Sequence, residues 1–361
     1  MKKKVVVGLS GGVDSSVAAY LLKEQGYDVI GVTMQIWQDD RSEAGGGCSD
    51  HQAVRDARAV AEQLDIPYYV MDFRQEFRKS VCDYFAGEYL QGRTPNPCVV
   101  CNRYVKWEAL LKRSAQLGAD HIATGHYARI RQLENGRFTI CNSVTAEKDQ
   151  TYALYNLTQD QLSRTLMPVG EFAKEDIRRI ARDIGLRTAQ KPDSQDICFV
   201  PDGDYASFLE NYTGCSCPEG NFVTADGRII GRHKGITHYT IGQRRGLELP
   251  MGHRVFVTEL RTDTNEVVVG ENSDLMKRTL IADKINFMSV PDLPREMEVT
   301  AKIRYNHKGA KARIRMEDDH RIRCVFAEPQ RAMTPGQAVV FYDRENVLGG
   351  GIIWRSENAG E

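Results

Sequence analysis

Apolar residues in the first half of the chain follow two alternating patterns. Short runs rich in β-branched residues, such as VVVGL at 5–9 and YDVIGVTMQIW at 27–37, are typical of buried strands. Other segments, such as SSVAAYLLKEQG at 15–26 and KWEALLKRSAQLG at 106–118, have the spacing of amphipathic helices. Because strands alternating with helices indicate a parallel sheet covered on both faces, we predict an α/β domain over residues 1–202.

The second half of the chain has a different pattern. Residues 203–275 are rich in glycine and turn residues, with a helical stretch only at YASFLENY. From 276 to 361 apolar and polar residues alternate with period two, as in MEVTAKIRY, QAVVFYD and VLGGGIIW. Short strands separated by turn signals predict a small, mostly-β central domain over 203–275 and a C-terminal β-barrel over 276–361.

Composition sets limits on the class of protein. The 361 residues are 41% hydrophobic and carry a net charge of −1. No apolar run approaches the roughly 20 residues of a membrane-spanning helix, and the apolar run after the first lysines is too short for a signal peptide. The nine cysteines are scattered and odd in number, which favours thiols in a reducing compartment over a disulfide framework. We therefore expect a cytoplasmic protein.

Positive charge is concentrated in two segments of this neutral chain. Residues 301–315 hold six lysines or arginines and no acid, and a second basic stretch runs from 231 to 246. Such segments predict either a positive face for nucleic acid or two solvated β-surfaces. Charge alone favours neither interpretation.

The stretch GLSGGVDSS at 8–16 lies directly between a strand pattern and a helix pattern. That position presents backbone N–H groups and a helix N-terminus to a phosphate, and glycines allow a close approach. Asp14 can hold a Mg²⁺ that bridges phosphate oxygens, whereas the lysine that ends a Walker loop is missing. We predict a nucleotide site made by Gly8, Leu9, Ser10, Gly11, Gly12, Val13, Asp14 and Ser15.

Ligands of open α/β sheets bind beyond the carboxyl ends of the strands. Met34 follows the second predicted strand, and Gly125 and His126 follow the strand pattern in DHIAT, so we expect these three residues near the nucleotide. The alternatives are plain core packing for Met34 and a backbone-bonded strand-end histidine for His126.

The stretch NPCVVC supplies one pair of cysteines, Cys98 and Cys101, and no second Cys-x-x-Cys follows. A structural zinc site needs four ligands, so a complete zinc finger is not expected. Cys215 and Cys217 have the wrong spacing and are assigned to a loop. Cys198 lies where the chain can return to the edge of the sheet that binds the nucleotide. From its spacing alone a buried apolar cysteine is the favoured interpretation.

Several stretches together resemble a known family. GLSGGVDSS resembles the phosphate loop of the ATP-pyrophosphatase superfamily, whose members cleave ATP to AMP and pyrophosphate and adenylate a substrate oxygen. With that loop, the chain from Gly8 to Tyr342 resembles the tRNA-specific 2-thiouridylases, which replace O2 of the wobble uridine with sulfur. The other matching stretches are GRTPNPCVVCNRYVKW, ATGHYARI, KDQTY, DSQDICF, THYTIGQRRGL, KIRYNH and TPGQAVVFY.

The resemblance implies roles for individual residues. Cys198 would receive a persulfide sulfur from a cysteine desulfurase or a sulfur relay protein, and that sulfur would attack C2 of the adenylated uridine. Cys101 would then attack Cys198 and leave a Cys101–Cys198 disulfide. The tRNAs would be those that accept lysine, glutamate and glutamine. The family also implies ATP contacts at Gly8 to Ser15, Met34 and Gly125, target-base contacts at Asn96, Pro97 and Cys98, and tRNA contacts at His126, Lys148, Asp149, Gln150, Arg304, Tyr305 and Gln337.

One position departs from the pattern of some relatives. They carry an aspartate where this chain has Cys98, so a carboxylate role is lost there. Cys98, Cys101 and Cys198 could instead hold a 4Fe-4S cluster that presents sulfur to the base, because soft thiolates select iron–sulfur centres. Of the two routes, the persulfide is slightly favoured.

Two other function classes fit the fold less well. A small-molecule ligase would need an amine source or a glutaminase domain, and no segment resembles one. A non-catalytic RNA-binding protein would have no need of an intact phosphate loop.

Overall fold

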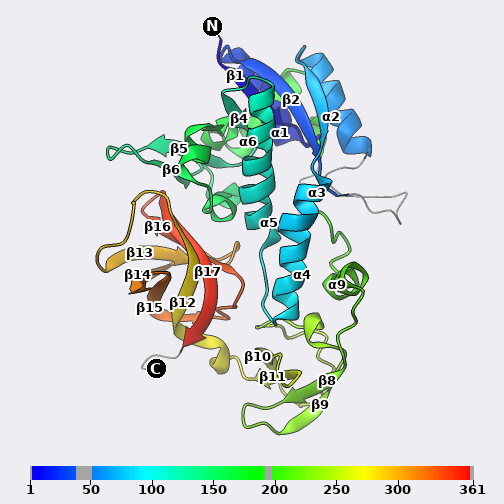
Figure 1. Ribbon diagram of the computed structural model, residues 1–361, viewed down its shortest axis with the longest axis vertical. Helices are drawn as coiled ribbons and strands as arrows, with labels where there is room; N and C mark the ends of the chain where they lie inside the picture. Colours follow the sequence, from blue (N-terminus) through cyan, green and yellow to red (C-terminus); the bar gives the residue numbers. More distant parts are fainter. Residues whose placement is uncertain (1, 38–50, 192–196, 358–361) are drawn as a thin grey trace.

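The computed structural model describes residues 2–37, 51–191 and 197–357. An α/β part forms the upper half of Figure 1, the last strands form a barrel beside it, and a small sheet lies at the lower end. Within the described residues, no helix has both the length and the apolar character that a membrane crossing requires. The predicted fold class of three successive architectures is confirmed.

The N-terminal part is built on a five-stranded sheet in which every pairing is parallel, ordered β3-β2-β1-β4-β7. The strand order reverses between β1 and β4, so the loops after these strands diverge and open the crevice where such sheets bind ligands. The strands are β1 (Lys4–Gly8), β2 (Asp28–Gln35), β3 (Tyr68–Asp72), β4 (His121–Ala123) and β7 (Thr165–Leu166).

Helices cover both faces of this sheet, and apolar side chains explain why. The three valines of β1 are completely buried, with one cluster of core residues on each face. One face packs against α1 (Val13–Glu24), α2 (His51–Gln63) and α8 (Lys174–Asp183). The other face packs against two long helices that extend away from the sheet in Figure 1.

Each long helix contains a π-helical turn. The first runs through α3 (Arg74–Phe77), η1 (Arg78–Cys82) and α4 (Asp83–Leu90). The second runs through α5 (Pro97–Val100), η2 (Cys101–Ala109) and α6 (Leu110–Gln116). Such turns are rare in proteins, and those that occur often lie at functional sites. The π-helical turn η2 begins at Cys101.

The central part contains α9 (Tyr205–Thr213), as the sequence predicts, and a four-stranded sheet ordered β10-β11-β8-β9. Its apolar core is small and includes Phe222, Tyr239 and Val257. The strands are β8 (Gly220–Val223), β9 (Ile229–His233), β10 (Phe256–Arg261) and β11 (Glu266–Gly270).

The last part is a closed six-stranded barrel, ordered β12-β15-β14-β13-β16-β17, with β12 and β17 paired to complete the circle. Closure removes the unpaired strand edges that attract other chains. The strands are β12 (Met276–Phe287), β13 (Met297–Lys302), β14 (Ala310–Asp318), β15 (Arg321–Arg331), β16 (Ala338–Asp343) and β17 (Asn346–Glu357).

A hairpin from the α/β part joins this barrel. Its strands, β5 (Ala128–Gln132) and β6 (Phe138–Asn142), pair with each other, and Cys141 pairs with Asn346 of β17. The sequence analysis did not predict this hairpin. The two parts therefore share a sheet. Val340 and Ile352 of the barrel also belong to the apolar cluster that the two long helices form.

Candidate functional site

The loop between β1 and α1 has the geometry of a phosphate cradle. Gly11 has φ of +71°, and a Cβ there would lie 2.5 Å from the carbonyl oxygen of Ala53, so only glycine fits. The Ser10 N–H donates to the Ser15 hydroxyl at 3.2 Å, and the Ser16 hydroxyl donates to the carbonyl of Gly12 at 2.8 Å. These bonds fix the loop at the N-terminus of α1.

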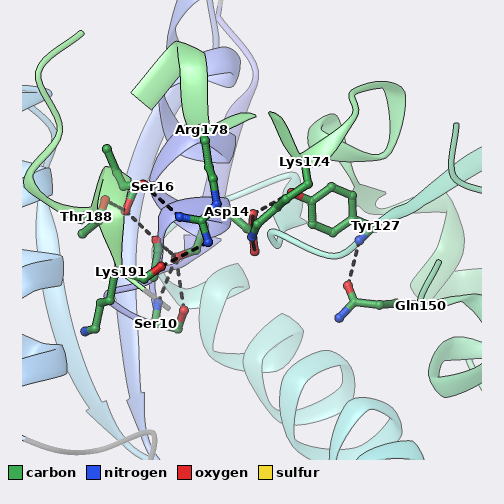
Figure 2. A network of polar contacts seen from close by, with 12 residues as sticks. Ser10, Asp14, Ser16, Tyr127, Gln150, Lys174, Arg178, Thr188 and Lys191 are labelled. Carbon is green, nitrogen blue, oxygen red and sulfur yellow. Dashed lines mark hydrogen bonds and ion pairs between the residues drawn. The ribbon is translucent and has the colours of Figure 1, made fainter. Parts of the chain in front are cut away.

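Asp14 lies in the first turn of α1 and meets two partners from distant segments (Figure 2). The Lys174 ammonium lies 2.8 Å from both carboxylate oxygens, and the Tyr127 hydroxyl donates to Oδ1 at 2.7 Å. Lys174 is only 8% exposed, which is rare for lysine and requires a paired charge. Sequence reasoning missed both partners.

Further cations surround the same loop. The Lys191 ammonium donates to the carbonyl of Gly11 at 3.2 Å and forms a 2.8 Å ion pair with Asp56. Arg178, on α8, donates to the carbonyls of Ala189 and Lys191 and so ties α8 to this segment. Figure 2 shows Arg178 and Lys191 on one side of Asp14 and Lys174 on the other, next to Tyr127. Together they make the loop suitable for a polyphosphate.

A Mg²⁺ ion fits at Asp14 only if the phosphates of a bound nucleotide supply further oxygen ligands. Asp14 is the carboxylate at the loop, and the described residues contain no group of three or more His, Cys, Asp or Glu side chains able to hold a metal. Mg²⁺ commonly binds through one or two carboxylates plus substrate phosphates. Asp14 can serve in that way once Lys174 turns from the carboxylate to the phosphates.

Of the predicted residues after β4, Gly125 lies directly against the loop. A Cβ on Gly125 would be 2.6 Å from the backbone nitrogen of Ser15, so glycine here lets the two segments touch. His126 is half-buried, its Nδ1 is 2.8 Å from the Thr124 hydroxyl, and its ring packs against Trp107. Burial, with a smaller effect of Lys106, holds the pKa of His126 well below its usual value. The ring is therefore neutral at pH 7.

The first cysteine pair begins the second long helix. Asn96 is the N-cap, and its side-chain oxygen accepts the Cys98 N–H at 3.1 Å, with Pro97 at the first helical position. Cys98 is exposed, whereas Cys101 is 5% exposed and packs in an apolar cluster. Burial raises the pKa of the neighbouring Cys82 to about 12. Cys82 therefore stays protonated and suits a structural role.

Cys198 is half-buried and packs against the apolar cluster that contains Cys101, and Met34 packs there too. Cys101 therefore belongs to an apolar cluster on the face of the sheet that the two long helices cover, and Cys198 and Met34 pack against the same cluster. Cys101 and Cys198 are thiols and not a disulfide in this structure. Residues 192–196, which precede Cys198 in the matching stretch, and Cys48 lie outside the described residues.

Cys98, Cys101 and Cys198 do not form a ligand set for an iron–sulfur cluster. None of the described Cys, His, Asp or Glu side chains gather in threes at metal-binding geometry. We therefore derive no step through a cluster.

Two of the predicted tRNA residues between Lys148 and Gln150 are engaged within the protein. The Asp149 carboxylate accepts the Thr151 N–H at 3.2 Å and the Ser143 N–H at 3.0 Å. The Gln150 side-chain oxygen accepts the Tyr127 N–H at 2.8 Å (Figure 2). This loop is thus joined through Tyr127 to Asp14. Their contacts with tRNA stay predictions.

The barrel residues lie near the same place. Arg304 donates to the carbonyl of Arg331 at 3.0 Å, and Tyr305, which is 45% exposed, packs edge-on against Tyr152. Burial raises the pKa of Tyr305, with smaller contributions from the charges of Asp149 and Cys98. An exposed ring can stack on an unpaired base.

Gln337 is directed towards the segment that precedes the second long helix. Its side-chain nitrogen donates to the carbonyl of Thr94 at 2.9 Å and to that of Pro95 at 3.4 Å. These residues come just before the N-cap Asn96.

Family models match all three parts of the chain. The "tRNA methyl transferase HUP domain" matches residues 3–202, the "tRNA methyl transferase PRC-barrel domain" 206–271, and the "Aminomethyltransferase beta-barrel domain" 277–353. The first model alone covers more than half of the chain.

Curated relatives match nearly the whole length. A protein of Lachnoclostridium phytofermentans described as "tRNA-specific 2-thiouridylase MnmA" is 64% identical over 97% of this chain and 99% of its own. Relatives with the same description from Clostridium perfringens and Clostridioides difficile are 55% and 52% identical, with at least 98% of each chain covered. A solved "4-thiouridine synthetase - RNA complex with bound ATP" covers 59% of this chain and 50% of its own, at 20% identity and a TM-score of 0.35.

Proposed function

The chain belongs to the tRNA-specific 2-thiouridylase family, and we propose from this premise how its residues carry out the reaction. It is a tRNA-uridine 2-sulfurtransferase that uses ATP. The names of two matching models mention methyl transfer, but the relatives that match almost the full length are thiouridylases. A phosphate loop together with Cys101 and Cys198 suits sulfur transfer.

One observation carries the mechanism: Cys101 and Cys198 pack in or against the same apolar cluster, on the face of the sheet that the two long helices cover. Replacing an activated oxygen by sulfur needs a loop that positions ATP and thiols that carry and release the sulfur, and this chain has both. A ligase without sulfur chemistry would have no use for this pair.

The first step adenylates the substrate. The α-phosphate of ATP, held over Gly8 to Ser15 with contacts at Met34 and Gly125, is attacked by O2 of the wobble uridine, and pyrophosphate leaves. Mg²⁺ bound with ATP at Asp14 would neutralise phosphate charge. Lys174, Arg178 and Lys191 stabilise the pyrophosphate, because cations at a developing anion lower its free energy most.

The second step transfers sulfur. A persulfide on Cys198 attacks C2 of the adenylated uridine through its outer sulfur. The Cys101 thiolate then attacks the inner sulfur of Cys198 and breaks the S–S bond, and the electron pair released forms the C2–sulfur double bond as AMP departs. The product is 2-thiouridine, and the Cys101–Cys198 disulfide takes two electrons from a thiol reductant before the next turnover.

The remaining assignments concern partners. Asn96, Pro97 and Cys98 would line the flipped base, since a base must leave its stack to react. His126, Lys148, Asp149, Gln150, Arg304, Tyr305 and Gln337 are the predicted tRNA-facing residues. The sulfur donor would be a cysteine desulfurase or a relay protein, the tRNAs would be the lysine, glutamate and glutamine acceptors, and the compartment would be the cytoplasm.

Pyrophosphate release with and without tRNA tests the proposal. We expect release that depends on tRNA and that accompanies formation of 2-thiouridine when a persulfide donor is supplied. Release that proceeds equally well without tRNA, or with a small-molecule acceptor, would contradict it.

A further inference from the structure

Asn102, the residue after Cys101, is a polar side chain in the apolar interior. It is 2% exposed, and its side-chain nitrogen donates to the carbonyl of Ala153 at 2.9 Å. Its side-chain oxygen is also buried, yet it accepts no hydrogen bond within the part of the chain that the structure describes. An unpaired buried acceptor costs more than a typical protein hydrogen bond contributes. Net stability therefore does not explain an asparagine at this position.

The bond from Asn102 ties the start of a helical turn to a distant segment. Cys101 and Asn102 are the first two residues of the π-helical turn η2, and Ala153 belongs to η4 (Thr151–Leu154). A π-helical turn is a short departure from the regular α-helix that is frequent at functional sites. Since Cys101 is the neighbour of Asn102 in the chain, the tie limits where the Cys101 thiol can lie.

The segment η4 is joined in turn to the phosphate loop by a series of hydrogen bonds. The Ala153 N–H donates to the carbonyl of Gln150 at 3.0 Å, and the Gln150 N–H donates to the carbonyl of Tyr127 at 3.0 Å. The Gln150 side chain accepts the Tyr127 N–H, and the Tyr127 hydroxyl donates to Asp14 (Figure 2). The series therefore ends in the first turn of α1, at the nucleotide site.

The proposed reaction needs the two ends of this series at a set separation. ATP activates the base at the phosphate loop, and the same base is released when the Cys101 thiolate attacks the inner sulfur of Cys198. The loop and the thiol must therefore be placed relative to each other. A misplacement of a reacting group by about 1 Å can slow an enzyme by about 100-fold.

We propose that Asn102 is a positioning residue, whose amide holds the start of η2 against η4 and so places Cys101 for its attack on Cys198. This inference rests on the proposed function. It leaves the tRNA contacts predicted at Gln150 and its neighbours unaffected, and it gives Asn102 no contact with the base. Loss of the amide should slow the step in which Cys101 releases the base more than the adenylation step.

The test follows single turnovers of persulfide-loaded Asn102→Leu, which keeps most of the side-chain volume and removes the donor. We expect pyrophosphate release and the Kd for tRNA to stay within about twofold of wild type, since neither depends on the position of Cys101. Release of 2-thiouridine should be about 3- to 10-fold slower, as the loss of one hydrogen bond implies. The adduct in which tRNA is joined to Cys198 should accumulate.

Asn286 on β12 offers a matched control. Its side-chain nitrogen donates to the carbonyls of Tyr155 and Leu157 at 2.8 and 3.1 Å, in the segment that follows η4. Asn286→Leu therefore loosens the same segment from the barrel side and leaves the cysteine helix tied. It should accumulate no adduct and should release 2-thiouridine within about twofold of the wild-type rate.

A second variant keeps the test decisive if melting temperatures show that Asn102→Leu does not fold. Asn102→Asp keeps the shape of the side chain, and only its protonated carboxyl can donate to Ala153. Burial favours that protonated form, and ionisation at higher pH replaces the donor by a charge. The rate of adduct resolution relative to wild type should therefore be higher at about pH 6 than at about pH 8.5.

Three results would overturn the proposal. The first is an adduct that resolves at the wild-type rate in Asn102→Leu. The second is equal accumulation in Asn102→Leu and Asn286→Leu, since loosening of the shared segment would then account for it. The third is a relative rate in Asn102→Asp that does not change with pH. Wild-type protein that releases no pyrophosphate with tRNA would instead contradict the proposed function, so the two failures are distinguishable.

Discussion

The ammonium group of Lys174 lies 2.8 Å from both carboxylate oxygens of Asp14, across 160 positions of sequence. This ion pair joins the N-terminus of α8 to the first turn of α1 at the phosphate loop. It places a positive charge at the proposed phosphate site. A bound Mg²⁺ would compete with Lys174 for Asp14, which leaves the ammonium available to the phosphates.

Replacing one partner of this pair should impair both stability and catalysis. Lys174→Met leaves the Asp14 carboxylate without its cation and removes charge from the phosphate site. We expect the free energy of unfolding to fall by about 2 kcal/mol, below the range for fully buried pairs because Asp14 is 27% exposed. The rate of tRNA-dependent pyrophosphate release should fall by about 100-fold, in line with the loss of one stabilising group.

A double-mutant cycle separates the two effects. Asp14→Asn combined with Lys174→Met removes both charges, so denaturant unfolding should show stability recovered relative to Lys174→Met alone. Pyrophosphate release should not recover. Recovery of activity together with stability would mean that the pair is only structural.

The sequence predicted the parts of the site that depend on local order. The phosphate loop is recognisable because glycines, a strand and a helix follow one another within a few residues. Lys174 is not, since it is the first residue of the highly charged segment KEDIRRIARD, and its packing against Tyr127 and Asp14 is a tertiary contact. The β5–β6 hairpin does have a local signal, Asn135-Gly136 between its two strands, whereas its pairing with β17 joins residues 205 positions apart and has none.

The cysteines show a different limit. Spacing alone favoured a plain buried residue at Cys198, and the role in sulfur transfer came from resemblance to a family. The structure adds that Cys198 packs against the cluster containing Cys101. Side-chain geometry across 97 positions of chain is a tertiary property that no local pattern encodes.

Tyr305 should contribute to tRNA affinity through its exposed ring. The side chain packs edge-on against Tyr152 and leaves 45% of its surface to solvent. Stacking of a base on an aromatic ring is worth about 1–3 kcal/mol, so Tyr305→Ala should weaken the Kd for tRNA by roughly 5- to 150-fold. Tyr305→Phe keeps the ring and should bind like wild type in an equilibrium binding assay. A Kd for Tyr305→Ala equal to that of wild type would remove Tyr305 from the interface.

His126 should make stability depend on pH in acid. Its pKa is held well below 6.5 by burial, so the unfolded chain binds the proton more readily than the folded one. The stability from this histidine is fully present above pH 6.5 and is lost as pH falls below that value, at a rate of at most about 1.4 kcal/mol per pH unit. Burial also lowers the pKa of His121, His233 and His307, so the whole protein shows a steeper slope.

The contribution of His126 appears as a difference between two proteins. Urea unfolding of wild type and His126→Gln at pH 7.5 and 5.5 gives the change in unfolding free energy for each. The variant should lose less stability than wild type between these values. Equal losses would show that His126 has an ordinary pKa in the folded state.

Substitution of each of the three cysteines should stop the reaction at a different step or leave it running. Adenylation precedes sulfur transfer, so Cys198→Ser should release pyrophosphate in a single turnover yet form no 2-thiouridine. Cys101→Ser should stop at the covalent intermediate, in which C2 of the base is still joined to Cys198 through an S–S bond. Cys98→Ser should keep at least about a tenth of wild-type thiolation, since Cys98 is exposed and the substitution keeps the backbone N–H that bonds to Asn96. Quantifying 2-thiouridine and tRNA-linked protein by mass spectrometry distinguishes these outcomes.

Iron and acid-labile sulfide, measured in anaerobically purified protein, test the cluster alternative. A stoichiometric cluster lost together with activity in Cys98→Ser would show that the three thiols gather around iron in a conformation other than this one, and the persulfide route would then fail.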